Sequence, residues 1–151
     1  MHQYVAQILW QDGENAFATG KYSRAHQWTF DGGVTVEASS SPLVVKLPYS
    51  KEDAVDPEEA FVASVSSCHM LTFLFLAYRE KLVIKSYRDK AVGFMDKNAE
   101  NRDWISRIEL HPDIEWVGPP PAREKLEALH HNAHHECYIA NSVKTAIEVS
   151  F

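Results

Sequence analysis

Two cysteines are the residues of this chain whose type and spacing most clearly suggest chemistry. Cys68 and Cys137 are the only cysteines and stand 69 positions apart, which fits neither a zinc finger nor a C-x-x-C redox turn. Because a thiolate is a nucleophile and two thiols can form a disulfide, a reactive dithiol is one interpretation. Because free cysteine is among the most buried residue types, two inert core residues are the other.

Arg24 is a further candidate, because it is a cation on a face that is predicted to be apolar. The alternation of side chains over residues 22 to 30 places Arg24 and His26 on the same strand face as three aromatic residues. A guanidinium keeps its charge, so Arg24 needs a carboxylate or an anionic ligand there. It could favour a nearby thiolate or form a structural ion pair, and the two roles are compatible.

Histidines offer a different kind of site. His130, His134 and Cys137 are spaced i, i+4, i+7 and share one side of a predicted helix. Zinc prefers nitrogen and sulfur ligands, so with Cys68 or His69 as a fourth ligand these residues give a zinc-binding alternative. Against this alternative, four histidines in six positions cover most of the helix circumference and produce such pairs by chance.

The first predicted helix carries Cys68. Asp56 as N-cap, Pro57 in the first turn and Glu59 three residues after the cap predict its start, and it is expected to run to about Glu80. Residues 60 to 78 contain no Asp, Glu, Lys or Arg over 19 positions, about the span of a bilayer. Polar residues in the middle and the lack of a second span argue against a membrane, so the domain itself is expected to enclose this helix.

The second predicted helix carries Cys137. Prolines at positions 119 to 121 introduce it, and it is expected to end near Cys137. Its apolar side includes Cys137, whereas His131 and His135 point toward solvent. The side chains that share the apolar arc are Leu126, Leu129, His130, Ala133 and Cys137.

The remaining segments read as strands. A hairpin is expected over residues 22 to 36 with its turn at Asp31-Gly32-Gly33. A short strand is expected at 42 to 47, and residues 143 to 151 alternate as a terminal strand. Residues 83 to 95 and 104 to 116 are expected to pair with each other. The order of these elements, strands, a long helix, strands, a second helix and a last strand, predicts an α+β fold with helices packed on largely antiparallel sheets. A single domain of residues 1 to 151 is expected.

Composition excludes several classes of protein. The 151 residues are 45% hydrophobic and 24% charged, with a net charge of -6, which gives nucleic acid nothing to bind. The N-terminus has no basic leader followed by an apolar core, so a cytoplasmic location is expected. In that compartment a disulfide between the cysteines would be transient and catalytic rather than structural.

Two segments resemble the OsmC/Ohr family of organic hydroperoxide reductases. D56-P-E-E-A-F-V-A-S-V-S-S-C68 is similar to the family's helix start, in which a peroxide-attacking cysteine follows the glutamate by ten residues. A133-H-H-E-C137, followed by Y-I-A-N-S-V-K and an alternating strand, resembles its second-cysteine helix and closing strand. The likeness extends from about Ala18 to Phe151.

The resemblance implies a role for each site residue. Cys68 would attack the peroxide, Cys137 would resolve the product, and Glu58 would orient an arginine, most plausibly Arg24. The family also implies an intertwined homodimer with its pocket at the subunit interface. An unbroken helix separates Glu58 from Cys68 by roughly 15 Å, so Glu58 of the partner subunit, or a break in the helix, is expected to complete the site.

The expected activity is therefore that of a thiol-dependent peroxidase that reduces organic hydroperoxides through a Cys68 sulfenic acid and a Cys68-Cys137 disulfide. No cofactor or metal is required. The expected partners are a second copy of the chain, an organic hydroperoxide and an external dithiol reductant such as a lipoyl protein or thioredoxin, with no nucleic acid and no membrane. The alternatives are a zinc-binding protein and a non-catalytic OsmC-like stress protein.

Overall fold

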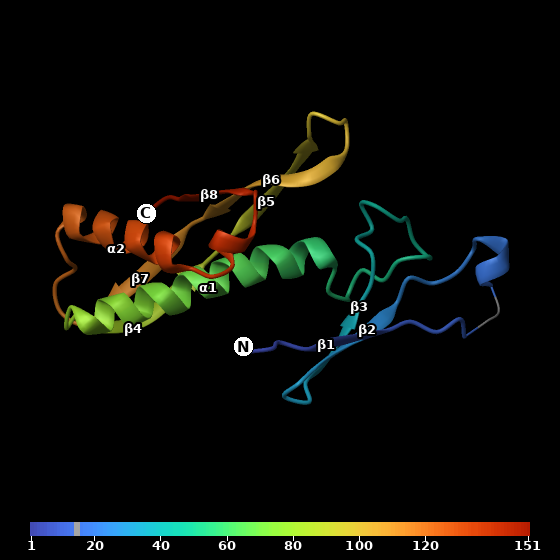
Figure 1. Ribbon diagram of the computed structural model, residues 1–151, viewed down its shortest axis with the longest axis horizontal. Coiled ribbons are helices and arrows are strands. Elements are labelled where there is room, and N and C mark those ends of the chain that lie inside the picture. Colours follow the sequence, from blue (N-terminus) through green and yellow to red (C-terminus); the bar gives the residue numbers. More distant parts are fainter. Residues whose placement is uncertain (14–15) are drawn as a thin grey trace. The chain divides into compact units, whose positions relative to one another are not determined.

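The computed structural model describes residues 1 to 13 and 16 to 151. Backbone contacts divide the chain into two compact units, Met1–Ala60 (unit 1) and Phe61–Phe151 (unit 2), and the elements of both are labelled in Figure 1. The boundary falls in the first turn of helix α1, Pro57–Arg79. The expected single domain of residues 1 to 151 stays a prediction.

Unit 1 is built on a three-stranded antiparallel sheet in the order β1-β2-β3. Its elements are β1 Ala6–Leu9, the 3-10 turn η1 Phe17–Thr19, β2 His26–Phe30 and β3 Thr35–Ala38. The predicted hairpin is confirmed, and Gly33 takes the positive φ of 84° that the turn requires. The strand begins at His26 rather than at residue 22, so Arg24 lies outside the ladder.

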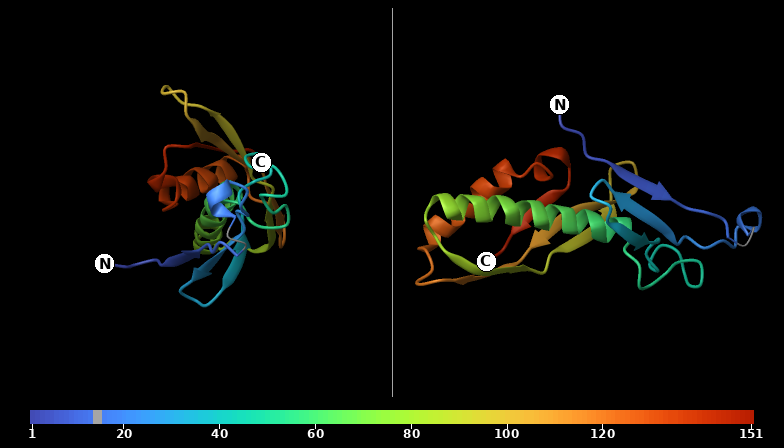
Figure 2. Two further views of the ribbon diagram at one scale, coloured as in Figure 1. Left: turned by 90° about the vertical axis from the view of Figure 1, so that its right-hand side faces the viewer. Right: turned by 90° about the horizontal axis from the view of Figure 1, so that it is seen from below.

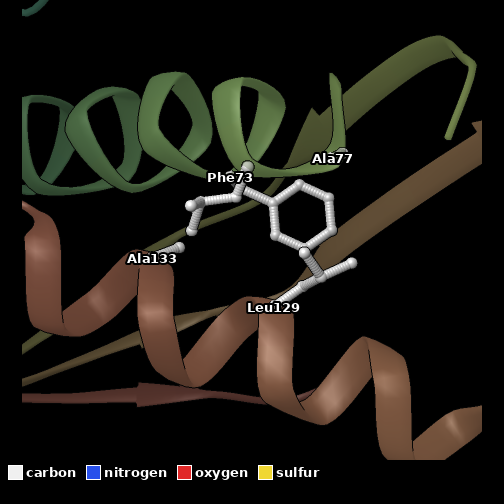
Figure 3. Packing of buried hydrophobic residues seen from close by; sticks show 5 residues of the cluster. Phe73, Ala77, Leu129 and Ala133 are labelled. Carbon is white, nitrogen blue, oxygen red and sulfur yellow. The ribbon is translucent and has the colours of Figure 1, made fainter. Parts of the chain in front are cut away.

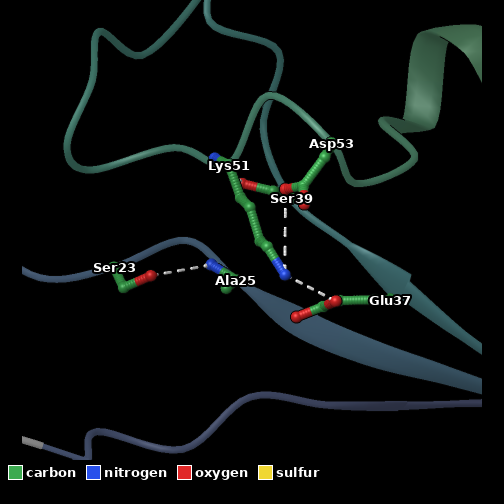
Figure 4. Close-up of polar contacts among 6 residues, drawn as sticks. All are labelled: Ser23, Ala25, Glu37, Ser39, Lys51 and Asp53. Atoms are coloured by element: carbon green, nitrogen blue, oxygen red, sulfur yellow. Dashed lines mark hydrogen bonds and ion pairs between the residues drawn. The ribbon is translucent and has the colours of Figure 1, made fainter.

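The segment between β3 and α1 is irregular. The short strand expected at 42 to 47 is wrong, because the Ser41 carbonyl accepts from the amides of Val44 and Val45 and closes a turn. Lys51 anchors the later part of the loop to the sheet (Figure 4): its Nζ lies 2.6 Å from a Glu37 carboxylate oxygen and its amide donates to Ser39 Oγ.

Helix α1 starts as predicted. The Glu59 amide donates to Asp56 Oδ1 at 2.7 Å, and the Asp56 amide donates to Glu59 Oε2 at 3.3 Å. These reciprocal bonds satisfy two backbone donors that a helix start leaves free, which confirms the capping box. The helix continues without a break to Arg79, one residue short of the expected end.

The expectation that the chain's own domain encloses α1 is wrong. Only 28% of its most apolar 18-residue window is buried, and the helix is long and apolar enough to cross a membrane by length and composition alone. Leu71, Phe75 and Tyr78 are 61%, 54% and 77% exposed. Their i, i+4, i+7 spacing puts them on one face, so the described part of unit 2 leaves an apolar stripe of α1 exposed.

Unit 2 combines two helices with two sheets. After α1 come β4 Ile84–Asp89, β5 Val92–Lys97, β6 Asp103–Leu110, β7 Pro112–Trp116, α2 Arg123–Glu136, the 3-10 turn η2 Ala140–Ser142 and β8 Ala146–Val149. The expected pairing of 83 to 95 with 104 to 116 is confirmed as two antiparallel ladders, β4 with β7 and β5 with β6. The terminal strand β8 is shorter than expected and pairs with β6 in parallel.

The core of unit 2 lies between the helices and the strands. One cluster joins the two helices through Phe73, Ala77, Leu129 and Ala133, which face one another in Figure 3. A second cluster packs Val65 of α1 against Ile108 and Leu110 of β6. Both helices lie on one side of the strands (Figure 2, left), and this packing fixes the segments that carry the two cysteines. The α+β class is thereby confirmed.

Candidate active site

Cys68 lies in the middle of α1, two turns or more from either end. Its side chain is half-buried and its thiol is free. Thr72 donates a hydrogen bond from Oγ1 to the Cys68 carbonyl at 2.9 Å, so this turn of the helix has an additional local bond. The sulfur is thus carried by a regular helical backbone, with part of the side chain open to small molecules.

Cys137 caps the C-terminus of α2 and is almost completely buried, at 1% exposure. Burial raises the pKa of its thiol to about 11, and a side-chain hydrogen bond with Cys68 adds to this shift. The Ala140 amide donates to its Sγ at 3.4 Å, which opposes the shift in part. Cys137 is therefore a protonated thiol at neutral pH.

The two thiols are neighbours although they are distant in sequence. The Cys68 side chain contributes to the raised pKa of Cys137, which places Cys68 of α1 near the end of α2, and both cysteines are free. Neighbouring thiols, one half-exposed and one held neutral, can perform two-electron chemistry in which the first is oxidised and the second closes a disulfide.

Asn141 fixes the backbone at Cys137. Its side-chain amide donates to the carbonyls of His135 and Cys137 at 2.8 and 2.9 Å, and its backbone amide also donates to the Cys137 carbonyl. These bonds satisfy carbonyls that the end of α2 leaves without helical partners. The position of the Cys137 backbone is therefore determined by a side chain beyond the helix.

A buried histidine pair joins α1 to α2, formed by two residues that the sequence indicated only as possible zinc ligands. His69 Nε2 lies 3.0 Å from His130 Nδ1, and each residue is 2% exposed. Burial lowers the pKa of His69 to about 4 and that of His130 to about 3. Both rings are therefore neutral at pH 7 and share one proton along the line that joins them.

Arg24 belongs to unit 1 and is held by local contacts. Its guanidinium donates to the Tyr22 carbonyl at 2.6 Å and lies 3.8 Å from the centre of the Tyr22 ring. A carbonyl and a π face thus accommodate part of the cation, and its need for a carboxylate or an anionic ligand stays a prediction. Among the described residues, no ion pair joins Arg24 to Glu58. The pairing of Arg24 with Cys68 stays a prediction.

Glu58 lies in the first turn of α1 and is half-buried. The capping bonds of that turn are made by Asp56 and Glu59, so in the described ranges the Glu58 carboxylate is not used in the capping box. This leaves it available for a cationic partner. Its role in orienting an arginine stays a prediction.

The geometry does not support the zinc alternative. Among residues 1 to 13 and 16 to 151, no group of three or more histidine, cysteine, aspartate or glutamate side chains is arranged to hold a metal ion. The His130 Nδ1 nitrogen is already bonded to His69. The i, i+4, i+7 spacing with His134 therefore creates no ligand set. His131 and His135 are exposed, as expected.

Fold and thiol pair together define an α+β protein with two neighbouring free cysteines on separate helices. Residues 50–151 match the family of OsmC-like proteins, and the chain belongs to that family. No curated protein matches the sequence.

Solved structures agree with this assignment. An OsmC-like protein of unknown function from Vibrio cholerae is 44% identical, with a TM-score of 0.96 over 99% of both chains. An organic hydroperoxide resistance protein from Elizabethkingia anophelis is 19% identical, with a TM-score of 0.72 over 99% of this chain and 93% of the other. One from Bacillus subtilis is 16% identical, with a TM-score of 0.67 over 99% and 98%. The last two show a shared fold.

Proposed function

We propose that this protein is a cysteine-based peroxidase that reduces organic hydroperoxides to alcohols. The proposal depends chiefly on the contact between Cys68 and Cys137, which unites two thiols from different helices. It is supported by membership of a family with a shared fold that includes organic hydroperoxide resistance proteins. Cytoplasmic location is part of the proposal, because a reducing compartment regenerates the dithiol.

The reaction has two chemical steps. The Cys68 thiolate attacks the outer oxygen of the hydroperoxide, the O–O bond breaks, and the alcohol leaves after taking a proton, so that Cys68 becomes a sulfenic acid. Cys137 then attacks that sulfur, water leaves, and a disulfide forms. An external dithiol, such as a lipoyl protein or thioredoxin, supplies the two electrons that restore both thiols.

Arg24 and Glu58 complete the proposed site. Arg24 would favour the Cys68 thiolate and stabilise charge on the leaving oxygen, and Glu58 would orient Arg24. Because α1 is unbroken, Glu58 and Cys68 of one chain stay roughly 15 Å apart along the helix. A site that uses Glu58 of the partner subunit removes this obstacle.

The apolar stripe of α1 supports the homodimer. Leu71, Phe75 and Tyr78 expose large side chains in a row, and soluble proteins rarely leave such a stripe open unless a partner covers it. A second copy of the chain supplies a matching stripe by symmetry, since a twofold interface uses the same surface on both subunits.

Intact mass after one equivalent of cumene hydroperoxide tests the function. The reduced protein is expected to lose two hydrogen atoms, and peptide mapping should place the new bond between Cys68 and Cys137. Cys68→Ser should abolish dithiol-dependent turnover. A Cys68→Ser variant with unchanged turnover, or a wild-type mass that does not change, would leave the non-catalytic alternative in place.

A further inference from the structure

A pocket of about 320 Å³ lies between α2 and the C-terminal segment of unit 2. One wall is polar and comes from α2, and the other is apolar and comes from Ile147 and Val149 of β8 and from Phe151. Ile147 and Val149 share one face of β8 because they are two positions apart on the strand. The polar wall consists of Glu127, His130, His131 and His134. We call this cavity the α2–β8 pocket.

His130 is held rigidly at this pocket. Its ring is stacked between Phe73 and Phe151, each with centroids 4.3 Å away. Its Nδ1 is bonded to His69, whereas its Nε2 is buried without a hydrogen-bond partner in the described chain. A buried polar atom without a partner costs free energy, so this residue of the pocket wall carries one unsatisfied nitrogen.

His134 repeats the feature one turn later. It stands four residues after His130 on the same face of α2. Its Nδ1 is also buried without a partner in the part of the chain that the structure describes. Two imidazole nitrogens on the same wall therefore lack hydrogen bonds, while the opposite wall offers hydrocarbon.

The charges at the pocket favour a neutral ligand. The pKa of His130 is lowered to about 3 by burial, so its ring offers no positive charge to an anion. The Glu127 carboxylate accepts a hydrogen bond from Arg123 Nε at 2.8 Å, so this carboxylate already has a cationic partner. The described residues contain no three-ligand metal group. A hydroxyl suits the site best, because it can both donate and accept and so fits either tautomer of His130.

We propose that the α2–β8 pocket binds a small neutral molecule that carries a hydroxyl group on an apolar body. The hydroxyl bonds the free imidazole nitrogens of His130 and His134, and the apolar body packs on Ile147, Val149 and Phe151. Phe151 is 44% exposed, so part of this apolar wall is open to solvent. This binding is separate from the peroxidase chemistry and involves neither cysteine.

Benzyl alcohol tests the proposal with reduced full-length protein and no peroxide. Side-chain ¹⁵N–¹H spectra of histidine-labelled protein should show saturable shifts at His130 and His134. Toluene lacks the hydroxyl and should bind roughly tenfold more weakly, and benzoate and benzylamine should be weaker still. His134→Phe, which keeps an aromatic ring but removes Nδ1, should weaken benzyl alcohol severalfold, whereas His135→Phe on the exposed side of α2 should not.

Several outcomes would overturn this assignment. One is that toluene binds as tightly as benzyl alcohol, and another is that benzoate or benzylamine binds more tightly. A third is that the largest shifts occur at residues outside the pocket, and a fourth is that the shifts do not saturate with benzyl alcohol. The comparison of the four probes needs only the wild-type chain, so it decides the question even if the His134 variant does not fold.

Discussion

His69 Nε2 and His130 Nδ1 lie 3.0 Å apart in the core and join α1 to α2. Cys68 directly precedes His69, and Cys137 ends the helix that carries His130. The bond therefore helps to fix the two helices whose alignment brings the sulfurs together. Because burial keeps both rings neutral, the bond depends on pH.

Acid should destabilise the protein through this pair. The pKa values of His69 and His130 in the folded chain are about 4 and about 3, below the usual 6.5. Below pH 6.5 the unfolded chain therefore binds more protons, and the free energy of unfolding falls as pH decreases, by up to about 1.4 kcal/mol per pH unit for each histidine. Above pH 6.5 the pair makes no contribution to the slope. Urea unfolding between pH 7.5 and 4 measures this.

A double variant isolates the histidine contribution. Replacement of both His69 and His130 by leucine should flatten the slope between pH 6.5 and 4, because the two imidazoles with lowered pKa values are removed. Replacement of the exposed His131 and His135 by leucine should leave it steep. A double variant as acid-sensitive as wild type would show that other groups control the transition.

Gly93→Ala should loosen the contact between α1 and β5. A Cβ at this position would lie 2.6 Å from Val62 Cγ2 and 3.5 Å from Ile105 Cγ2. Overpacking of this kind costs about 1 to 3 kcal/mol of unfolding free energy, which thermal or urea unfolding detects. Gly32→Ala is the control, since nothing lies within 4 Å of its Cβ. Val62→Ala combined with Gly93→Ala should recover part of the loss.

Cys137→Ser should trap the first oxidation product. Without the second thiol, the Cys68 sulfenic acid persists, reacts with dimedone, and proceeds to sulfinic acid as peroxide increases. Mass spectrometry of peroxide-treated protein should find these adducts on Cys68 alone. If the variant forms no dimedone adduct, Cys68 is not the peroxide-reactive thiol.

Arg24→Gln should slow the alkylation of Cys68 by iodoacetamide at pH 7, because the proposed cation no longer favours the thiolate. Arg24→Lys should retain part of the rate. Arg102→Gln is a control on an exposed residue that pairs with Glu100. If Cys68 is alkylated at the same rate in all variants and in wild type, Arg24 does not activate Cys68, and Arg79 or Arg88 is tested next.

Phe75→Lys should separate the proposed dimer. It introduces a charge in the middle of the apolar stripe of α1, where burial against a second copy would desolvate it. Light scattering after size exclusion should give the mass of one chain for the variant and of two chains for wild type. Tyr138→Lys changes a residue that is 80% exposed outside the stripe and should remain a dimer. A wild-type monomer would contradict the shared site.

Local signals in the sequence predicted local structure well. The Asp56 and Glu59 spacing located the start of α1, because a capping box depends only on neighbours in the chain. The glycine turn gave the β2–β3 hairpin, and the helical arc gave the burial of Cys137. The α+β class followed from the order of these elements.

Features that depend on distant segments were not predicted. The parallel pairing of β8 with β6 and the bond between His69 and His130 join residues far apart in sequence, for which no local pattern exists. The uncovered stripe of α1 was misjudged for a related reason. Apolar composition shows that a surface avoids water, but it does not show which chain covers that surface.

The clamp that Asn141 forms on the end of α2 limits what can move at Cys137. Two carbonyls of the last turn are tethered from outside the helix, so unwinding would break those bonds as well as the helical ones. Closure of a disulfide would thus proceed by rotation about the Cα–Cβ bond of Cys137 on a stationary main chain. Reduced and oxidised proteins should have nearly the same backbone, and a reductant would meet the same surface before and after each catalytic cycle.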